Sequence, residues 1–119
     1  MKQSPIFVRT YDLLRWLIPV TVKFPRTHRF VLAARLQETA LRFQERLIDA
    51  ARSPQPIPIL AEADTDLVKL RLYLRLCRDL ELVRFSQYEH GQRLVNEVGR
   101  LMGGWREKVD PSVQAKRRR

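Results

Sequence analysis

The sequence has only one cysteine, Cys77, and only two histidines, His28 and His90. A single thiol excludes an intramolecular disulfide and a cysteine-rich zinc site, and it fits a reducing compartment. The histidines lie near the starts of two different predicted helices, so we expect no two-histidine metal site. Because Cys77 falls between Leu74 and Leu80 on an apolar helix face, we interpret it as a core residue.

The sequence also lacks the motifs of common enzyme classes. It contains no His-Glu-x-x-His pattern, no Walker phosphate loop and no dinucleotide-binding glycine fingerprint. Its carboxylates are scattered over polar helix faces, where pairs such as Glu38 and Arg42 are ordinary neighbours one turn apart. We therefore expect no catalytic residue, no metal ion and no cofactor.

No long apolar run is present at the N-terminus. Prolines and charged residues interrupt the first 23 residues, among them Pro5, Arg9, Asp12, Arg15 and Pro19. This segment differs from a signal peptide or a membrane-spanning helix, both of which need an uninterrupted apolar stretch. The sequence thus predicts a cytoplasmic protein that is not bound to a membrane.

What the sequence has in excess is positive charge. The 119 residues include 23 Lys and Arg against 13 Asp and Glu, which gives a formal net charge of +10, and 18 of the cations are Arg. The planar guanidinium pairs bidentately with phosphate, so this surplus favours binding to a polyanion over a merely solubilising surface. With 45% hydrophobic residues, the chain can also bury a core as a single domain.

Apolar residues recur at helical spacing in four segments, and no segment alternates as a half-buried strand would. The sequence predicts an all-α protein with helices over about residues 5–24, 28–51, 59–83 and 87–108. Two of the three connections are short, which favours an antiparallel, up-down four-helix bundle. We expect this bundle to comprise residues 1–109 and to be followed by a basic, flexible C-terminal tail at residues 110–119.

Local signals define the predicted helix boundaries. Ser4 is the expected N-cap of the first helix, Thr27 caps the second, and Ser86 opens a capping box for the fourth. The stretch 52–58 contains three prolines and is predicted to be the one long loop. Asp66 is expected near the positive N-terminal end of the third helix.

In the second helix, six apolar residues lie on one broad side and are predicted to face the core: Phe30, Leu36, Leu41, Phe43, Leu47 and Ile48.

The third helix has more apolar surface than one bundle seam needs. Eight residues cover roughly 200° of its circumference: Leu70, Leu72, Tyr73, Leu74, Leu76, Cys77, Leu80 and Val83. The excess favours burial on a second side by a neighbouring subunit, with a deep central position in the monomer as the alternative. Arg71, Arg75 and Arg78 fall together within about 60° on the same helix, either as a solvated face or as a binding surface for phosphate or carboxylate.

The fourth helix contains Gly99 and Gly103, one turn apart on the same face. Glycine inside a helix costs about 1 kcal/mol relative to alanine. Close packing against another helix backbone would explain that cost, and fraying around Gly103 is the alternative.

Three runs carry a family resemblance: residues 24–28 (FPRTH), residues 70–75 (LRLYLR) and residues 96–105 (NEVGRLMGGW). Together they resemble the accessory variability determinant (Avd) proteins of diversity-generating retroelements. The resemblance extends over about residues 6–108, with the segments in the right order and of matching length.

The resemblance implies a four-helix bundle that assembles into a barrel-like homopentamer with a basic surface. Proteins of this family are not enzymes. They bind the element's reverse transcriptase and nucleic acid, RNA or cDNA, and they support mutagenic retrohoming. A related bundle protein of the ribosomal-RNA intervening-sequence type, or a basic structural scaffold, is the alternative function.

The resemblance also carries over to particular residues. Arg71 and Arg75 match the paired arginines of the family's third helix, Arg26 matches the basic residue after the proline between the first two helices, and Arg100 follows Gly99 in the last helix. Together with Arg78 and the four cations of the tail, these arginines form the candidate surface for nucleic acid and reverse transcriptase. The tail cations are Lys116, Arg117, Arg118 and Arg119.

Overall fold

The computed structural model describes residues 4–112. Four long helices account for most of them: α1 (Pro5–Val22), α3 (Ala34–Arg52), α4 (Pro56–Asp79) and α5 (Phe85–Val109). A single turn, α2 (Arg26–His28), and a π-helical segment, η1 (Arg29–Ala33), lead into α3. No strand occurs within residues 4–112, so the predicted all-α architecture is confirmed.

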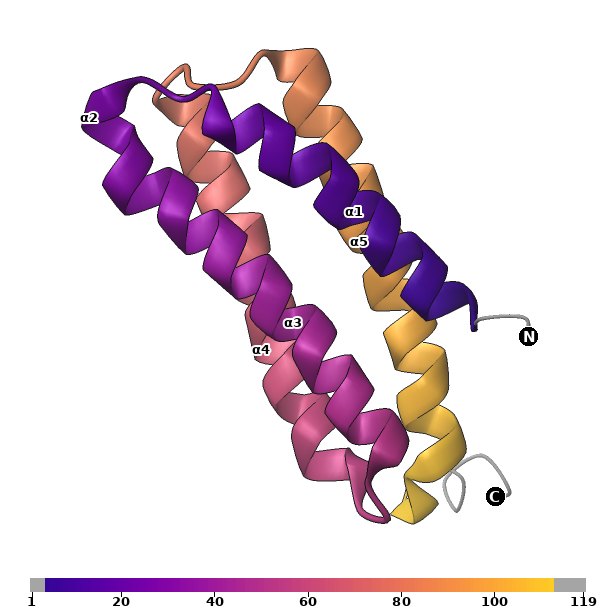
Figure 1. Cartoon of the computed structure of the whole chain (residues 1–119). Helices are drawn as coiled ribbons and strands as arrows, with labels where there is room; N and C mark the ends of the chain where they lie inside the picture. The colour runs from indigo at the N-terminus through magenta and orange to yellow at the C-terminus, as the bar shows by residue number, and fades with distance from the viewer. Residues whose placement is uncertain (1–3, 113–119) are drawn as a thin grey trace.

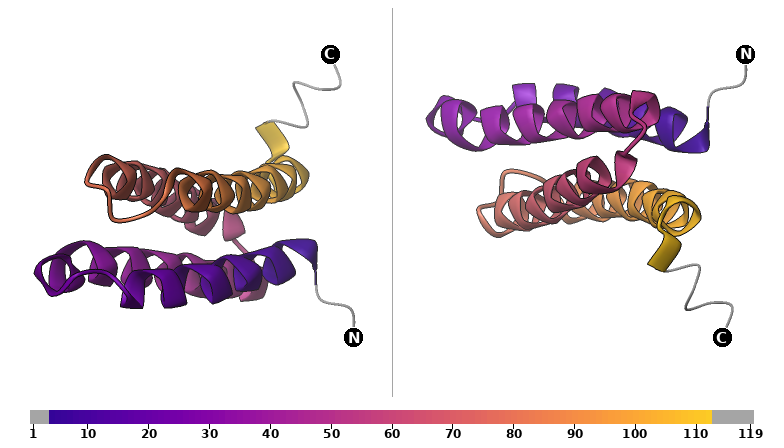
Figure 2. Two further views of the ribbon diagram at one scale, coloured as in Figure 1. Left: turned by 90° about the horizontal axis from the view of Figure 1, so that it is seen from above. Right: turned by 90° about the horizontal axis from the view of Figure 1, so that it is seen from below.

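The helices form two layers, with α1 and α3 in one and α4 and α5 in the other (Figure 2). Successive long helices run in opposite directions, which confirms the up-down topology of a four-helix bundle (Figure 1). Contacts join α1 to α3, α3 to α4, α4 to α5 and α5 back to α1. In the bundle, α4 therefore occupies the position diagonal to α1.

The core runs along the bundle axis between the two layers. Its largest fully buried side chains come from all four long helices: Leu13, Leu17, Leu36, Phe43, Leu47, Leu60, Leu67, Leu70, Leu74, Val95, Val98 and Met102. Cys77 is fully buried among them, as predicted, and burial raises the pKa of its thiol to about 11. A thiol with this pKa packs as a small apolar group.

The second helical segment begins two residues earlier than predicted. Its N-cap is Pro25, and Thr27 lies inside α2, so Thr27 is not the cap. The π-helical segment was not expected either. Residues seven apart share a helix face, so an uninterrupted α-helix would place Arg29 on the buried side with Leu36. The π turn accommodates about one extra residue, and Arg29 stays exposed.

Only half of the apolar face predicted for this segment is in the core. Leu36, Phe43 and Leu47 are fully buried, whereas Leu41 and Ile48 are each more than 40% exposed. The last two lie at the margin of the apolar arc, where α1 and α4 do not cover them. Phe30, the sixth predicted core residue, is 77% exposed beyond the π turn.

Proline and capping signals at the other boundaries also misled the prediction. The long loop expected over residues 52–58 is shorter, because α4 already begins at Pro56. Proline is tolerated in a first helical turn, where amide donors have no helical partner. At the other end, α4 stops at Asp79, and Glu81 adopts a left-handed conformation with φ 60°. The N-cap of α5 is Arg84 rather than Ser86, and its amide donates to Gln87 Oε1 at 2.9 Å.

None of the helices within residues 4–112 is both long and apolar enough to cross a membrane.

Candidate nucleic-acid and partner interface

Arg71 reaches from α4 to α5. Its Nε donates a hydrogen bond to Asn96 Oδ1 at 3.3 Å, and Gln92 Nε2 donates to the Arg71 carbonyl at 3.5 Å. A Cβ placed on Gly99 would lie 2.8 Å from Arg71 Nη2. Gly99 thus provides room for a guanidinium rather than for a second helix backbone, which was the expected contact.

The other two arginines of α4 differ from Arg71. Arg75 is exposed and has no ion pair within the described residues. Arg78 pairs with Asp79 at 3.1 Å and lies over the ring of Tyr88, 4.8 Å from its centroid. A carboxylate therefore compensates the charge of Arg78, whereas Arg71 and Arg75 keep their full positive charge for a partner.

The same helix has an apolar row that no other part of residues 4–112 covers. Val68 is 57% exposed, Leu72 is 61% exposed, and Leu76 is 40% exposed. With a spacing of four residues, these side chains line one side of the helix, away from the buried Leu70 and Leu74. The wide apolar arc of α4 therefore has a core side and an uncovered side, so a deep central position within the monomer does not explain it.

Arg26 and Arg100 lie in different surroundings. Arg26 is the exposed first residue of α2. Arg100 is exposed on α5 and forms a bidentate pair with Glu97, at 2.7 Å and 3.2 Å. The hydrogen bond from Arg100 lowers the pKa of Glu97. The charge of Arg100 is thus already neutralised within the helix, whereas that of Arg26 is not.

The four cations of the predicted tail, Lys116 to Arg119, lie outside the described residues.

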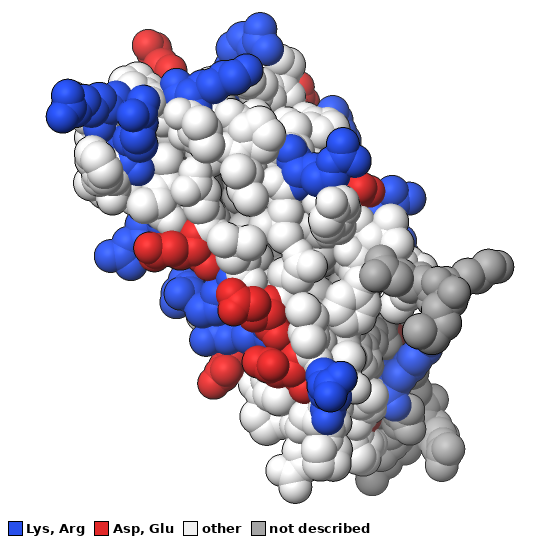
Figure 3. Space-filling view, viewed as in Figure 1, with Lys and Arg blue, Asp and Glu red and all other residues white. Residues whose placement is uncertain are grey.

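Arg26 belongs to a segment without acids. From Leu13 to Gln37 the sequence contains no Asp or Glu but five cations: Arg15, Lys23, Arg26, Arg29 and Arg35. Lys and Arg gather around the α2 end of the bundle, where some acidic side chains also lie at the top, and Asp and Glu follow the lower part of α3 on the same face (Figure 3). The acid-free segment from Leu13 to Gln37 therefore brings an excess of positive charge to the α2 end.

The Gly103 position is open. A Cβ placed there would have no heavy atom of the described residues within 4 Å, so Gly103 has no packing role inside this part of the chain. A contact with another subunit stays a prediction. Gly91, elsewhere on α5, makes room for a side chain of α1, because a Cβ there would be 2.7 Å from Trp16 Cη2. Sequence reasoning did not single out Gly91.

A pocket of about 540 Å³ lies beside the N-terminal end of α1, against α5. Phe7, Leu101 and Trp105 give it an apolar lining, and Arg100 and Lys108 also line it. The ring centroids of Phe7 and Trp105 are 6.4 Å apart. No group of side chains within residues 4–112 could hold a metal ion.

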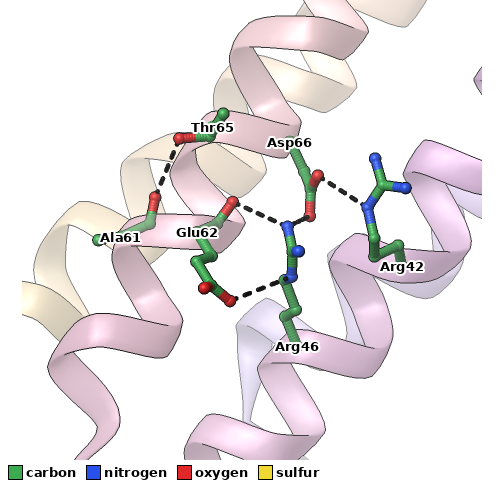
Figure 4. A network of polar contacts seen from close by, with 6 residues as sticks. All are labelled: Arg42, Arg46, Ala61, Glu62, Thr65 and Asp66. Carbon is green, nitrogen blue, oxygen red and sulfur yellow. Dashed lines mark hydrogen bonds and ion pairs between the residues drawn. The ribbon is translucent and has the colours of Figure 1, made fainter.

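A buried ion-pair network between α3 and α4 was missed (Figure 4). Asp66 is completely buried and accepts hydrogen bonds from Arg42 Nε at 3.2 Å and from Arg46 Nη1 at 2.7 Å. Arg46 also donates to the Glu62 carbonyl at 3.2 Å. Because α4 begins at Pro56, Asp66 lies in its third turn and does not serve the helix N-terminus. The available signal was an acid at a position whose neighbours in the helical pattern, such as Ala63 and Leu70, are apolar.

The sequence matches the bAvd-like protein family over residues 6–109. This range includes nearly all of the four long helices and the uncovered row of α4, and it confirms the resemblance seen in the sequence. No curated protein matches the chain significantly.

Proposed function

The chain belongs to the bAvd-like family, and from that premise we propose that it is a non-catalytic accessory protein of a diversity-generating retroelement. In this role it assembles with copies of itself and binds the element's reverse transcriptase together with template RNA or cDNA. It thereby supports the mutagenic copying that diversifies a target gene.

The observation that carries this proposal is the pairing of two surfaces on α4. Val68, Leu72 and Leu76 form an uncovered apolar row, and Arg71 and Arg75 lie beside it. Contiguous exposed apolar residues commonly mark protein interfaces. We assign the row to self-association, and the closed ring of five subunits is what the resemblance to Avd proteins implies; in such a ring each head-to-tail contact uses two different faces of one protomer.

Assembly strengthens the basic surface by repetition. Each copy in a ring brings its own Arg71 and Arg75, so a long polyanion can bind several copies at once, and the effective concentration of the later contacts is high. Guanidinium groups pair bidentately with phosphate oxygens. A ring of such groups is therefore suited to a nucleic-acid backbone, whose charge repeats along its length.

The self-association half of the proposal is tested by light scattering of the wild-type protein and of a variant carrying both Leu72→Glu and Leu76→Glu. We expect the wild type to be a pentamer and the variant to be a folded monomer, because two carboxylates per subunit would have to be desolvated at the interface. Leu41→Glu, at an exposed site on α3 outside the row, is the control and should stay pentameric. A wild-type protein that is a well-folded monomer at micromolar concentration would rule out this assembly.

The binding half is tested by titrating template-repeat RNA at several salt concentrations. Each phosphate contact contributes about −0.7 to −0.9 to the slope of log affinity against log salt. We expect Arg71→Ala with Arg75→Ala to flatten that slope and to weaken capture of the reverse transcriptase. Arg9→Ala is the matched control, because Arg9 is already paired with Asp12 at 3.2 Å.

Deleting residues 116–119 should have a smaller effect than the double arginine change. If the deletion abolished RNA binding while Arg71→Ala with Arg75→Ala left affinity and slope intact, the tail alone would be the anchor. A chain that captures neither RNA nor the reverse transcriptase encoded beside it would contradict the retroelement role.

A further inference from the structure

Phe30 is the most exposed large apolar side chain in the described part of the chain, at 77%, and its neighbour Val31 is 62% exposed. Both belong to η1, at the start of the long second helical segment. An isolated exposed apolar residue needs no explanation. An exposed aromatic ring inside a concentrated positive charge does.

The π turn holds Phe30 in this position. The amide of Ala34 donates to the carbonyl of Arg29, five residues back, which is the hydrogen bond of a π-helix. Leu32 and Ala33, in the same turn, are buried and anchor it to the core. Phe30 is therefore carried on hydrogen-bonded backbone rather than on a free loop, which lowers the entropic cost of using it in binding.

The surroundings of Phe30 are basic. Arg26 and Arg29 are exposed within one turn of it, and Lys23 is exposed at the end of α1. The elements that contact η1 most are α1, α2 and α3. Their acids nearest to Phe30 in sequence are Glu38, two turns further along, and Asp12, near the start of α1. Phe30 thus has two exposed arginines within one turn of it and no acid within one turn of it along the chain.

We propose that Phe30, Arg26 and Arg29 form a stacking site for the bases of single-stranded nucleic acid. The site deepens the function proposed above, on which it rests, by naming the form of nucleic acid that is bound. Aromatic rings stack on unpaired bases whose faces are free, while nearby arginines bind the phosphates that link them. In a duplex the base faces are covered by their neighbours, so the ring would add nothing to backbone contacts. A purely apolar partner would gain nothing from the arginines.

The test compares binding of a labelled oligouridylate with binding of an RNA duplex of equal length. We expect the wild type to prefer the single strand. Phe30→Leu keeps an apolar side chain but loses the flat ring, and it should weaken single-strand binding about tenfold with an unchanged salt slope. Phe30→Trp should retain the affinity, and the fluorescence of the introduced indole should be quenched by the bound strand.

Two matched variants separate the contributions. Arg26→Ala with Arg29→Ala should flatten the salt slope, because these residues act through phosphates. Leu41→Ala removes an exposed apolar side chain of α3 that lies one turn from Glu38 and Glu45, and it should change nothing. All these positions except Leu41 are exposed near the α2 end, and circular dichroism should report an unchanged fold for each variant.

The remaining outcomes overturn the inference in distinguishable ways. If Phe30→Leu binds the single strand as well as the wild type, or if the duplex is preferred, no base stacks on Phe30, while the proposed function stands. If Phe30→Ala reduces the oligomer mass or capture of the reverse transcriptase, and Phe30→Leu does not, the ring serves a protein contact instead. If the wild type binds neither nucleic acid, both this inference and the nucleic-acid half of the proposed function are wrong.

Discussion

Replacing Asp66 tests how the two layers of the bundle are held together. Its carboxylate is completely buried and receives Arg42 and Arg46 from α3, whose side chains are 42% and 27% exposed. Removing the acid leaves two arginines that can turn into water. Removing the arginines instead leaves a carboxylate that cannot.

The magnitudes follow from this asymmetry. Asp66→Ala loses two charge-assisted hydrogen bonds, each worth about 1.5–3 kcal/mol when fully buried, but the exposure of the arginine heads reduces this contribution. Alanine also returns about 0.5 kcal/mol of helix propensity. We expect a net loss of about 2 kcal/mol, and a melting temperature lower by roughly 10 °C.

The loss of stability in the arginine variants should follow the length of the hydrogen bond to Asp66 and the exposure of each arginine. Arg46→Ala should destabilise more than Arg42→Ala, because the Arg46 bond is shorter, at 2.7 Å against 3.2 Å, and Arg46 is less exposed. Losing both arginines leaves a buried, unpaired charge, which costs about 3–5 kcal/mol. Adding Asp66→Ala to that double variant removes the charge and should restore stability.

Urea unfolding followed by circular dichroism, at one fixed protein concentration, measures all five variants. Fixing the concentration matters because the stability of an oligomer depends on it. A triple variant that is less stable than the double arginine variant would refute the reasoning, because the unpaired buried carboxylate would then stabilise the protein. An Asp66→Ala variant within 0.5 kcal/mol of wild type, about the limit of an ordinary surface change, would do the same.

Two further predictions concern the core and α5. Gly103→Ala should raise the free energy of unfolding by about 1 kcal/mol, whereas Gly91→Ala should gain nothing, because its Cβ would lie 2.7 Å from Trp16; equal urea midpoints for the two variants would contradict this. The thiol of Cys77, whose pKa burial raises from 9.0 to about 11, should react with a disulfide reagent only as fast as the protein opens. Its contribution to stability should be present below pH 9.0 and decline as the pH rises toward 11, and rapid labelling of the folded protein at neutral pH would show that Cys77 is not buried.

Helical periodicity was enough to predict the class and topology of the fold. The buried residues of α4 and α5, such as Leu67, Leu74 and Val98, repeat at the spacing that one helix face requires. The boundaries were less accurate, because a proline that cannot continue a helix can still begin one, as Pro56 does. The prolines that predicted a loop are also residues that can occupy the first turn of a helix.

The candidate interface was predictable only where it depended on a single helix. The uncovered row of α4 followed from an apolar arc too wide for one seam, and the structure places Leu72 and Leu76 outside the core as that arc implied. Contacts between two helices could not be predicted from the sequence in this way. The apolar neighbours of Asp66 in the helical pattern indicate that it is buried, but they do not identify Arg46 as its partner, and the space that Gly99 leaves for Arg71 has no sequence signature. Both contacts depend on the relative axial position of two helices.

The π turn explains the largest single error, the assignment of Phe30 to the core. A helical wheel assumes about 100° per residue throughout, and one π turn rotates every residue before it by roughly the angle of one extra residue. That rotation keeps Arg29 out of the apolar core, where its charge would have been unpaired, and it leaves Phe30 in solvent among arginines. Breaks in local regularity of this kind concentrate at functional sites, and the ring that this break exposes is the one to which we assign base stacking.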